Sequence, residues 1–153
     1  MTAIISNLEE ITRETLIEKL GENNISSDPV MVVAGRIAEV SINPELLNPA
    51  YLAQLKVITL PLFDNSSFQV YLDKSTFYRQ SISLRGSMAE SSTAVFFLSM
   101  TEKQVWAALR IPDERILFII KYVQLAGKHY LFQADITEVE RYECEVLMPP
   151  EQE

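Results

Sequence analysis

The residues most able to do covalent chemistry in this sequence of 153 residues are its one histidine, His129, and its one cysteine, Cys144. A thiol and an imidazole are the groups of a nucleophile–base pair. However, His129 directly follows a turn signal at residues 127–128, which favours a solvent-facing hairpin position. Cys144 alternates with Tyr142 and Val146, the spacing of an inward-facing strand residue, and a buried thiol behaves as a small apolar group. We therefore predict no catalytic residue and no enzyme.

Other common chemistries lack the residues that they require. A single histidine excludes the paired histidines of a zinc hydrolase helix, and a single cysteine excludes a multi-cysteine zinc site or an intramolecular disulfide. The four glycines are too widely spaced for a glycine-rich phosphate loop. No carboxyl group stands in an apolar stretch that would raise its pKa for acid catalysis. The expected cofactors and metals are therefore none.

The charge is unevenly distributed along the chain. There are 13 Lys and Arg residues against 21 Asp and Glu, giving a net charge of −8, and the excess acid lies in residues 1–29 and 138–153. No cluster of Lys and Arg is present for phosphate groups, and every apolar run is shorter than the ~18 residues of a membrane span, so we expect neither nucleic-acid binding nor membrane insertion. The acidic ends either provide solubility or contact a basic partner.

Residues 1–20 lack the basic start and the apolar stretch of a signal peptide. This predicts a cytoplasmic protein, or a secreted or periplasmic one from which the signal has been removed.

Four aromatic residues fall on strand faces opposite the main apolar series: Tyr78, Phe97, Trp106 and Tyr122. Two interpretations are open. In the first, which we favour, they pack under a second layer of structure. In the second, they form an exposed aromatic patch for a partner.

These residues must be positioned by a mainly β (α+β) fold. A capping box at Ser6 and Glu9 predicts a helix over residues 7–20, which ends at Gly21 and is followed by a polar linker. From residue 30 onward the apolar spacing changes to two, with turn signals every 8–12 residues, and a short helix is expected over 49–55. About eight short antiparallel strands follow, the last over 142–146, in a β-sandwich or a rolled sheet.

The expected organisation is one domain with simple ends: an N-terminal helix and linker over 1–29, a β-rich domain over 30–148, and a short acidic tail over 149–153. Five large apolar residues on different strands are expected to share one core: Phe96, Leu98, Leu109, Ile119 and Phe132.

Several short phrases in residues 36–140 occur in a familiar order. They are Leu60-Pro61-Leu62-Phe63-Asp64, then Ser83-Leu84-Arg85-Gly86, then a small-residue loop and an apolar strand at 91–98, and finally Pro112-Asp113 before a closing hairpin. In this order the chain resembles the N-terminal propeptide-like β domain of bacterial reprolysin-type (adamalysin-like) zinc metalloproteases, without the protease domain. It departs from that family at Ala107 and Ala108, where a glycine is usual, and Cys144 lacks the flanking Pro and Gly of a zinc-blocking cysteine.

The resemblance implies a non-enzymatic protein-binding module of the chaperone or inhibitor type, with a protease or an exported protein as its partner. The alternative is an acidic cytosolic interaction protein, such as a specialised chaperone, immunity protein or assembly factor. In the first case, the acidic segment 138–153, including Glu143 and Glu145, is the expected contact with the partner.

Overall fold

The computed structural model describes residues 2–147, and of residues 144–147 it describes the backbone alone. All of the strands described lie in a single antiparallel sheet of nine strands, in the order β1-β2-β9-β8-β7-β6-β5-β4-β3. This confirms the mainly β class and, of the two architectures expected, the rolled sheet. The strands are β1 (Ile5–Ile11), β2 (Arg36–Ile42), β3 (Val57–Pro61), β4 (Ser67–Tyr78), β5 (Ser81–Met88), β6 (Ser91–Thr101), β7 (Gln104–Ile111), β8 (Ile116–Val123) and β9 (Lys128–Asp135).

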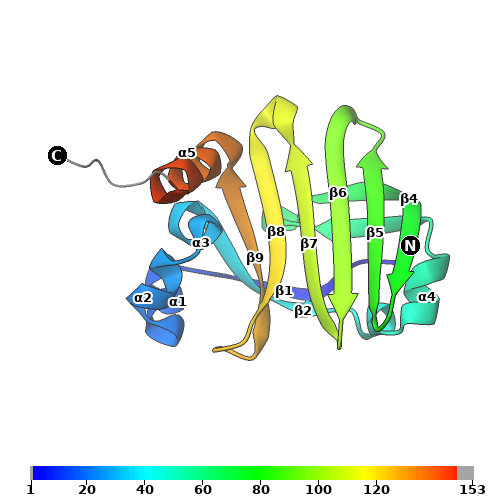
Figure 1. Cartoon of the computed structure of the whole chain (residues 1–153), viewed down its shortest axis with the longest axis horizontal. Coiled ribbons are helices and arrows are strands. Elements are labelled where there is room, and N and C mark those ends of the chain that lie inside the picture. Colours follow the sequence, from blue (N-terminus) through cyan, green and yellow to red (C-terminus); the bar gives the residue numbers. More distant parts are fainter. Residues whose placement is uncertain (1, 148–153) are drawn as a thin grey trace.

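The helices are short and gather at two places around the sheet (Figure 1). The α-helices are α1 (Arg13–Leu20), α2 (Glu22–Ser26), α3 (Pro29–Val33), α4 (Pro49–Gln54) and α5 (Ile136–Leu147), and the 3-10 turns are η1 (Pro44–Leu47), η2 (Phe63–Asn65) and η3 (Pro112–Glu114). Helices α1, α2, α3 and α5 lie on the β9 side of the molecule, and α4 lies on the β4 side. The short helix expected after Asn48 is confirmed, because the Asn48 side chain accepts a hydrogen bond from the N–H of Ala50.

The sheet curls into a half-barrel, and the residues before β1 join its two border strands. The N–H of Ile4 donates to the carbonyl of Thr59 in β3 at 3.0 Å, and the N–H of Thr59 donates to the carbonyl of Thr2 at 2.8 Å. Asn43, at the end of β2, also donates from its side chain to the carbonyl of Ala3. The chain therefore begins by linking the first and last strands of the sheet.

Strand residues alternate between two separate apolar cores, one on each side of the sheet. Phe96, Leu98 and Leu109 lie in the larger core, inside the curl. Ile119 and Phe132 lie in the smaller core, between the outer side of β2, β9 and β8 and the helices. All five are buried, as expected, but the prediction of one shared core is wrong: β8 and β9 are covered on both sides, so their apolar residues point both ways.

The helix predicted over residues 7–20 is wrong in its first part. Residues 5–11 form β1, in which Leu8 pairs with Val40 of β2, and the helix begins only after Thr12, whose side chain accepts from the N–H of Thr15. Pairing with β2 outweighs the local capping signal, and the Ser6 hydroxyl donates to the carbonyl of Ser41 instead. The helix end at Gly21 is confirmed, with φ of 83°.

Two further local predictions are corrected. The polar linker contains the short helix α2, and α3 occupies the start of the predicted strand, so that the next strand begins at Arg36 rather than at residue 30. The final strand expected over 142–146 is part of α5. The alternation covers only Tyr142, Cys144 and Val146, and the first and last of these have the i, i+4 spacing of a helix face. The buried Ile136 and Val139 likewise have the i, i+3 spacing of a helix face packed on the sheet.

Candidate protein-binding face

One large part of the outer sheet surface has no helix over it. We call the outer side of β4, β5, β6 and β7 the open face. In Figure 1 the helices lie to either side of β5, β6 and β7, which leaves the outward side of these strands uncovered. The register defines the face: Arg85 of β5 is paired with Phe97 of β6, which is paired with Ala108 of β7, and Ser99 is paired with Trp106.

Large aromatic side chains are exposed on the open face. Phe97 is 44% exposed, Trp106 45%, Tyr78 69% and Tyr71 41%. The favoured prediction, that Tyr78, Phe97 and Trp106 pack under a second layer, is therefore wrong, and the alternative of an exposed aromatic patch describes them. Tyr122 is half-buried.

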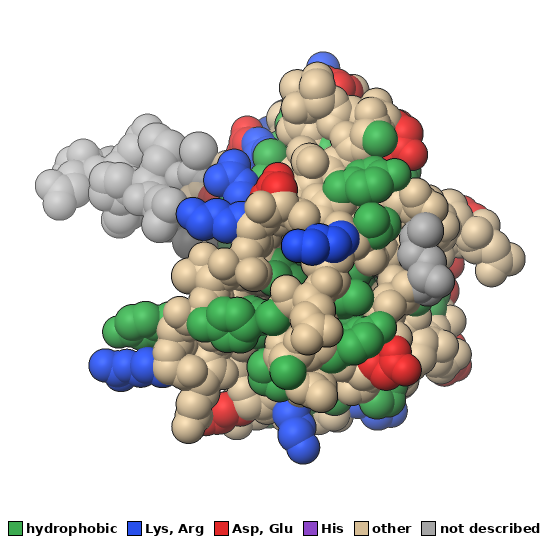
Figure 2. Space-filling view, turned by 90° about the vertical axis from the view of Figure 1, so that its right-hand side faces the viewer, with side chains coloured by type: hydrophobic (Ala, Val, Ile, Leu, Met, Phe, Trp, Pro, Cys, Tyr) green, Lys and Arg blue, Asp and Glu red, His purple; other side chains and the backbone are tan. Residues whose placement is uncertain are grey.

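The open face combines these aromatic residues with cations and almost no acid. Strands β5, β6 and β7 contain no Asp or Glu, although the whole chain has 21 of them. The Arg85 guanidinium lies 5.4 Å from the centroid of the Phe97 ring, and that of Arg79 lies 5.3 Å from the centroid of the Tyr78 ring. Figure 2, which views the molecule from the β4 side, shows hydrophobic side chains exposed between Lys and Arg.

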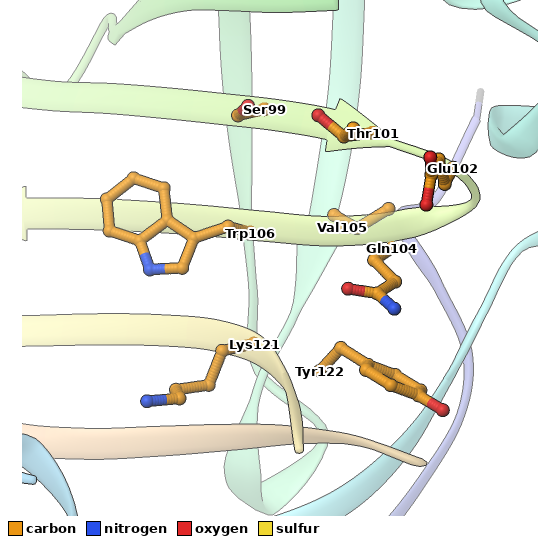
Figure 3. Close-up of a pocket in the computed structure, with 8 residues that line it drawn as sticks. All are labelled: Ser99, Thr101, Glu102, Gln104, Val105, Trp106, Lys121 and Tyr122. Atoms are coloured by element: carbon orange, nitrogen blue, oxygen red, sulfur yellow. The ribbon is translucent and has the colours of Figure 1, made fainter. Parts of the chain in front are cut away.

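A shallow hollow lies at the border between the open face and the helix-covered part of the sheet. Its volume is about 320 Å³. Trp106 of β7 and Lys121 of β8 both line it, and their side chains lie side by side on neighbouring strands (Figure 3). Lys121 forms an ion pair with Asp28, the residue that caps α3. The indole ring of Trp106 therefore stands at the edge of the helical cover without being enclosed by it.

His129, the possible base of a nucleophile–base pair, is not the solvent-facing residue that the sequence predicted. It is half-buried, its Nε2 accepts a hydrogen bond from the N–H of Val105 at 3.0 Å, and its ring makes an edge contact with Tyr122 at 5.1 Å between centroids. Burial lowers the pKa of His129 below its ordinary value of 6.5. The imidazole is therefore a neutral structural acceptor that ties β9 to the start of β7.

Cys144 lies in α5, and its side chain is outside the described part of the structure, so its predicted burial stays a prediction. Among the described residues, no three His, Cys, Asp or Glu side chains come together in a way that could hold a metal ion.

The acidic C-terminal segment lies partly within α5. Glu140 pairs with Arg110 of β7 at 2.7 Å, and Glu138 pairs with Arg141 at 3.5 Å, whereas Glu143 is exposed. The side chain of Glu145 and residues 149–153 are outside the described residues. The proposed contact of this segment with a partner stays a prediction.

Sequence reasoning missed the open face as a unit, although a signal was present. Residues 81–111 contain Arg85 and Arg110 in three consecutive strands with acidic residues confined to the turns, at Glu90 and Glu102. Such segregation, together with aromatic residues at outward positions, would have indicated three neighbouring strands without acidic residues of their own.

The chain was compared with known proteins. No family model matches it, and no curated protein matches it in sequence. A solved structure described as "Structure of a chaperone-substrate complex" is similar with a TM-score of 0.45 and 10% sequence identity, over 78% of this chain and 87% of that one. A likeness this distant carries no argument about function. No helix within residues 2–147 is long and apolar enough to cross a membrane.

Proposed function

We propose that this chain is a non-enzymatic protein-binding module and that the open face contacts its partner. The observation that carries the proposal is the exposure of Phe97 and Trp106 on the outer side of β5, β6 and β7, three strands that contain no acidic residue. Aromatic residues and arginine are enriched at the centres of protein interfaces, because they bury large areas with little loss of conformational freedom. The neutral, hydrogen-bonded state of His129 supports a structural rather than a catalytic role for that residue.

The electrostatics of the open face indicate what kind of protein surface would fit. Lys74 of β4 and Arg85 of β5 are paired on this face, whereas the whole chain has a net charge of −8. A partner surface that carries acidic side chains around an apolar centre would be steered to this face and away from the rest of the molecule. In its narrower form, the proposal is that the partner is a protease or an exported protein, as the resemblance implies.

The test is a comparison of proteins captured from the source cell by three forms of the chain. The double variant Phe97→Ser with Trp106→Ser removes the aromatic centre of the open face. Leu125→Ser is the matched control, because Leu125 is a similarly exposed apolar residue, 66% exposed, in the turn between β8 and β9. We expect a defined protein, captured in stoichiometric amount by the wild type and by Leu125→Ser, to be lost from the double variant. Capture that is the same for all three folded forms would overturn the proposal.

A further inference from the structure

The last strand of the open face has a free edge. Strand β3 pairs with β4 only along residues 67–71, and the last contact on that side is the hydrogen bond from the N–H of Leu72 to the carbonyl of Lys56, at 2.8 Å. Residues 73–78 continue β4, and residues 74–78 pair with β5 on their other side. These six residues are all exposed, and no described residue forms a backbone hydrogen bond with their outer edge.

The register identifies which backbone groups are unpaired. A two-residue turn at Arg79 and Gln80 joins β4 to β5, so the flanking pair of Tyr78 with Ser81 exchanges the hydrogen bonds that close the hairpin. Alternate residues of an antiparallel strand direct their N–H and C=O groups to opposite sides. Ser75 and Phe77 therefore direct their backbone groups away from β5, toward the free edge.

The edge results from a bend in β4. A bulge lies between Leu72 and Lys74, and it turns the second half of β4 away from the line of β3, so that it forms the right-hand border of the sheet in Figure 1. Opposite the bulge stands Gly86, where a Cβ atom would come within 2.8 Å of the carbonyl oxygen of Tyr71. Only glycine allows the two strands to approach so closely at this point.

We propose that an extended, acidic segment of the partner protein adds to this edge as a further strand, beside residues 73–78. This inference rests on the proposed function and specifies how the partner enters the open face. Backbone hydrogen bonds to Ser75 and Phe77 would give affinity, and alternating side chains of the added strand would give specificity.

Charge and apolar exposure around the edge define the chemistry of the added segment. Two cations and one acid, Lys56, Lys74 and Asp73, line a small groove beside the edge, together with the apolar side chains of Leu55 and Leu72. Phe77, which is paired with the inward-facing Ile82, is 56% exposed. An added strand with acidic residues on its outer side and apolar residues on its inner side would meet Lys74 with the former and Phe77 with the latter.

The same charges argue against a second copy of this chain as the occupant. Two copies paired edge to edge would bring three cations of each chain, Lys56, Lys74 and Arg79, toward those of the other, with only Asp73 of each edge to offset them. Like charges placed opposite one another destabilise a strand pair. We therefore assign the edge to a segment of a different protein.

The test measures binding of labelled eight-residue peptides by fluorescence anisotropy. We expect a peptide of alternating Glu and Val to bind at least tenfold more tightly than one of alternating Lys and Val, and its binding to weaken as salt is added. Ser75→Pro removes one edge N–H without breaking a bond to β5 and should weaken binding at least tenfold, whereas the matched variant Ser75→Ala should bind within twofold of the wild type. Amide hydrogen exchange should show that the N–H groups of Ser75 and Phe77 become protected when the acidic peptide binds.

A side-chain variant keeps the test decisive should Ser75→Pro unfold. The double variant Lys56→Glu with Lys74→Glu should reverse the preference, so that the peptide of alternating Lys and Val binds more tightly. Equal binding of both peptides to the wild type would overturn the inference. So would a dimer of the wild type that Ser75→Pro abolishes, or binding of a twelve-nucleotide oligothymidine through Phe97 and Trp106 in the absence of peptide binding.

Repeating the capture experiment with Ser75→Pro and Ser75→Ala separates the two proposals. A partner lost from both the aromatic double variant and Ser75→Pro, but retained by Ser75→Ala, supports both. A partner lost from the aromatic double variant alone overturns the strand addition and leaves the proposed function in place. If no captured partner depends on Phe97 and Trp106, the proposed function itself is overturned.

Discussion

The outer surface of the sheet has two halves that share one backbone and differ in what covers them. Over β2, β9 and β8, the outward residues Ile37, Phe132 and Ile119 are buried beneath α1, α2, α3 and α5. Over β4 to β7, most outward residues are polar, the apolar ones being Val95, Ala108 and a few aromatic residues, and Phe97 and Trp106 remain about half exposed. The chain supplies helices where the outward residues are consistently apolar. The aromatic residues of the open face therefore do not form a hydrophobic core from which a covering helix is missing.

The two halves should respond very differently to the loss of an aromatic ring. Phe132 is fully buried between β9 and the helices, so Phe132→Ala removes apolar contacts and leaves a cavity. We expect it to lower the free energy of unfolding by about 3–5 kcal/mol. Urea unfolding followed by circular dichroism measures this loss, and a loss below about 1 kcal/mol would mean that the helices do not pack on this half of the sheet.

The border between the halves should be held more weakly than the covered core. The carboxylate of Asp28 accepts hydrogen bonds from the N–H groups of Val30 and Met31 at the start of α3, and it pairs with Lys121 beside the hollow at Trp106. Asp28→Ala should cost about 1–2 kcal/mol, the usual range for loss of a helix cap. Asp28→Asn keeps the cap and should retain most of this stability; an equal loss for both variants would assign the effect to the ion pair instead.

Lowering the pH should destabilise the protein through His129. Burial holds the pKa of His129 in the folded protein below the ordinary value of 6.5, so between these two values the unfolded chain binds more protons than the folded one. The contribution of His129 is therefore fully present above about pH 7 and is lost as the pH falls below 6.5. The carboxyl groups of Glu10, Glu39 and Asp64 also have lowered pKa values, but their effect begins only in more acidic solution.

The measurement for His129 is the free energy of unfolding between pH 7 and pH 5. His129→Gln keeps an acceptor for the N–H of Val105 without a titrating group, so its unfolding free energy should change less over this range than that of the wild type. The same slope in both proteins would assign the effect to other groups.

The smallest effect on stability is expected on the open face. The double variant Phe97→Ser with Trp106→Ser removes two side chains that are each more than two-fifths exposed, and each change should alter the free energy of unfolding by about 0.5 kcal/mol or less. A loss as large as that of Phe132→Ala would show that the open face is part of the folding core.

Local patterns predicted the middle of this chain well and its two ends poorly. Between Val57 and Asp135, the strands follow one another as hairpins, so each pairs with its sequence neighbour and the turn signals determine the register. At the N-terminus, Ser6 and Leu8 satisfied the pattern of a helix start, but β1 is fixed by pairing with β2, which the local sequence does not encode. At the C-terminus, three alternating residues were too few to distinguish a strand from α5.

The candidate site was predictable in its residue types but not in its exposure. Outward aromatic residues at positions 97 and 106 are compatible with a sheet face that is covered or exposed. Whether they are buried depends on where α1, α3 and α5 pack. These helices cover β9 and β8 because Tyr130, Phe132 and Ile119 also face outward there. That choice is made between segments far apart in sequence, and a reading of one strand at a time does not reveal it.

The pairing of β2 with β9 has a consequence for how the chain folds as it is synthesised. Strands β3 to β9 can form one hairpin at a time, each soon after it leaves the ribosome, whereas Arg36 must wait for Gln133 before β2 has its second partner beside β1. The entropy lost in closing so long a loop slows this step relative to the hairpins. We therefore expect the seam between β2 and β9 to form last, so that β1 and β2, which pair with each other, leave the β2 edge uncovered during most of synthesis and exposed to aggregation or to capture by chaperones.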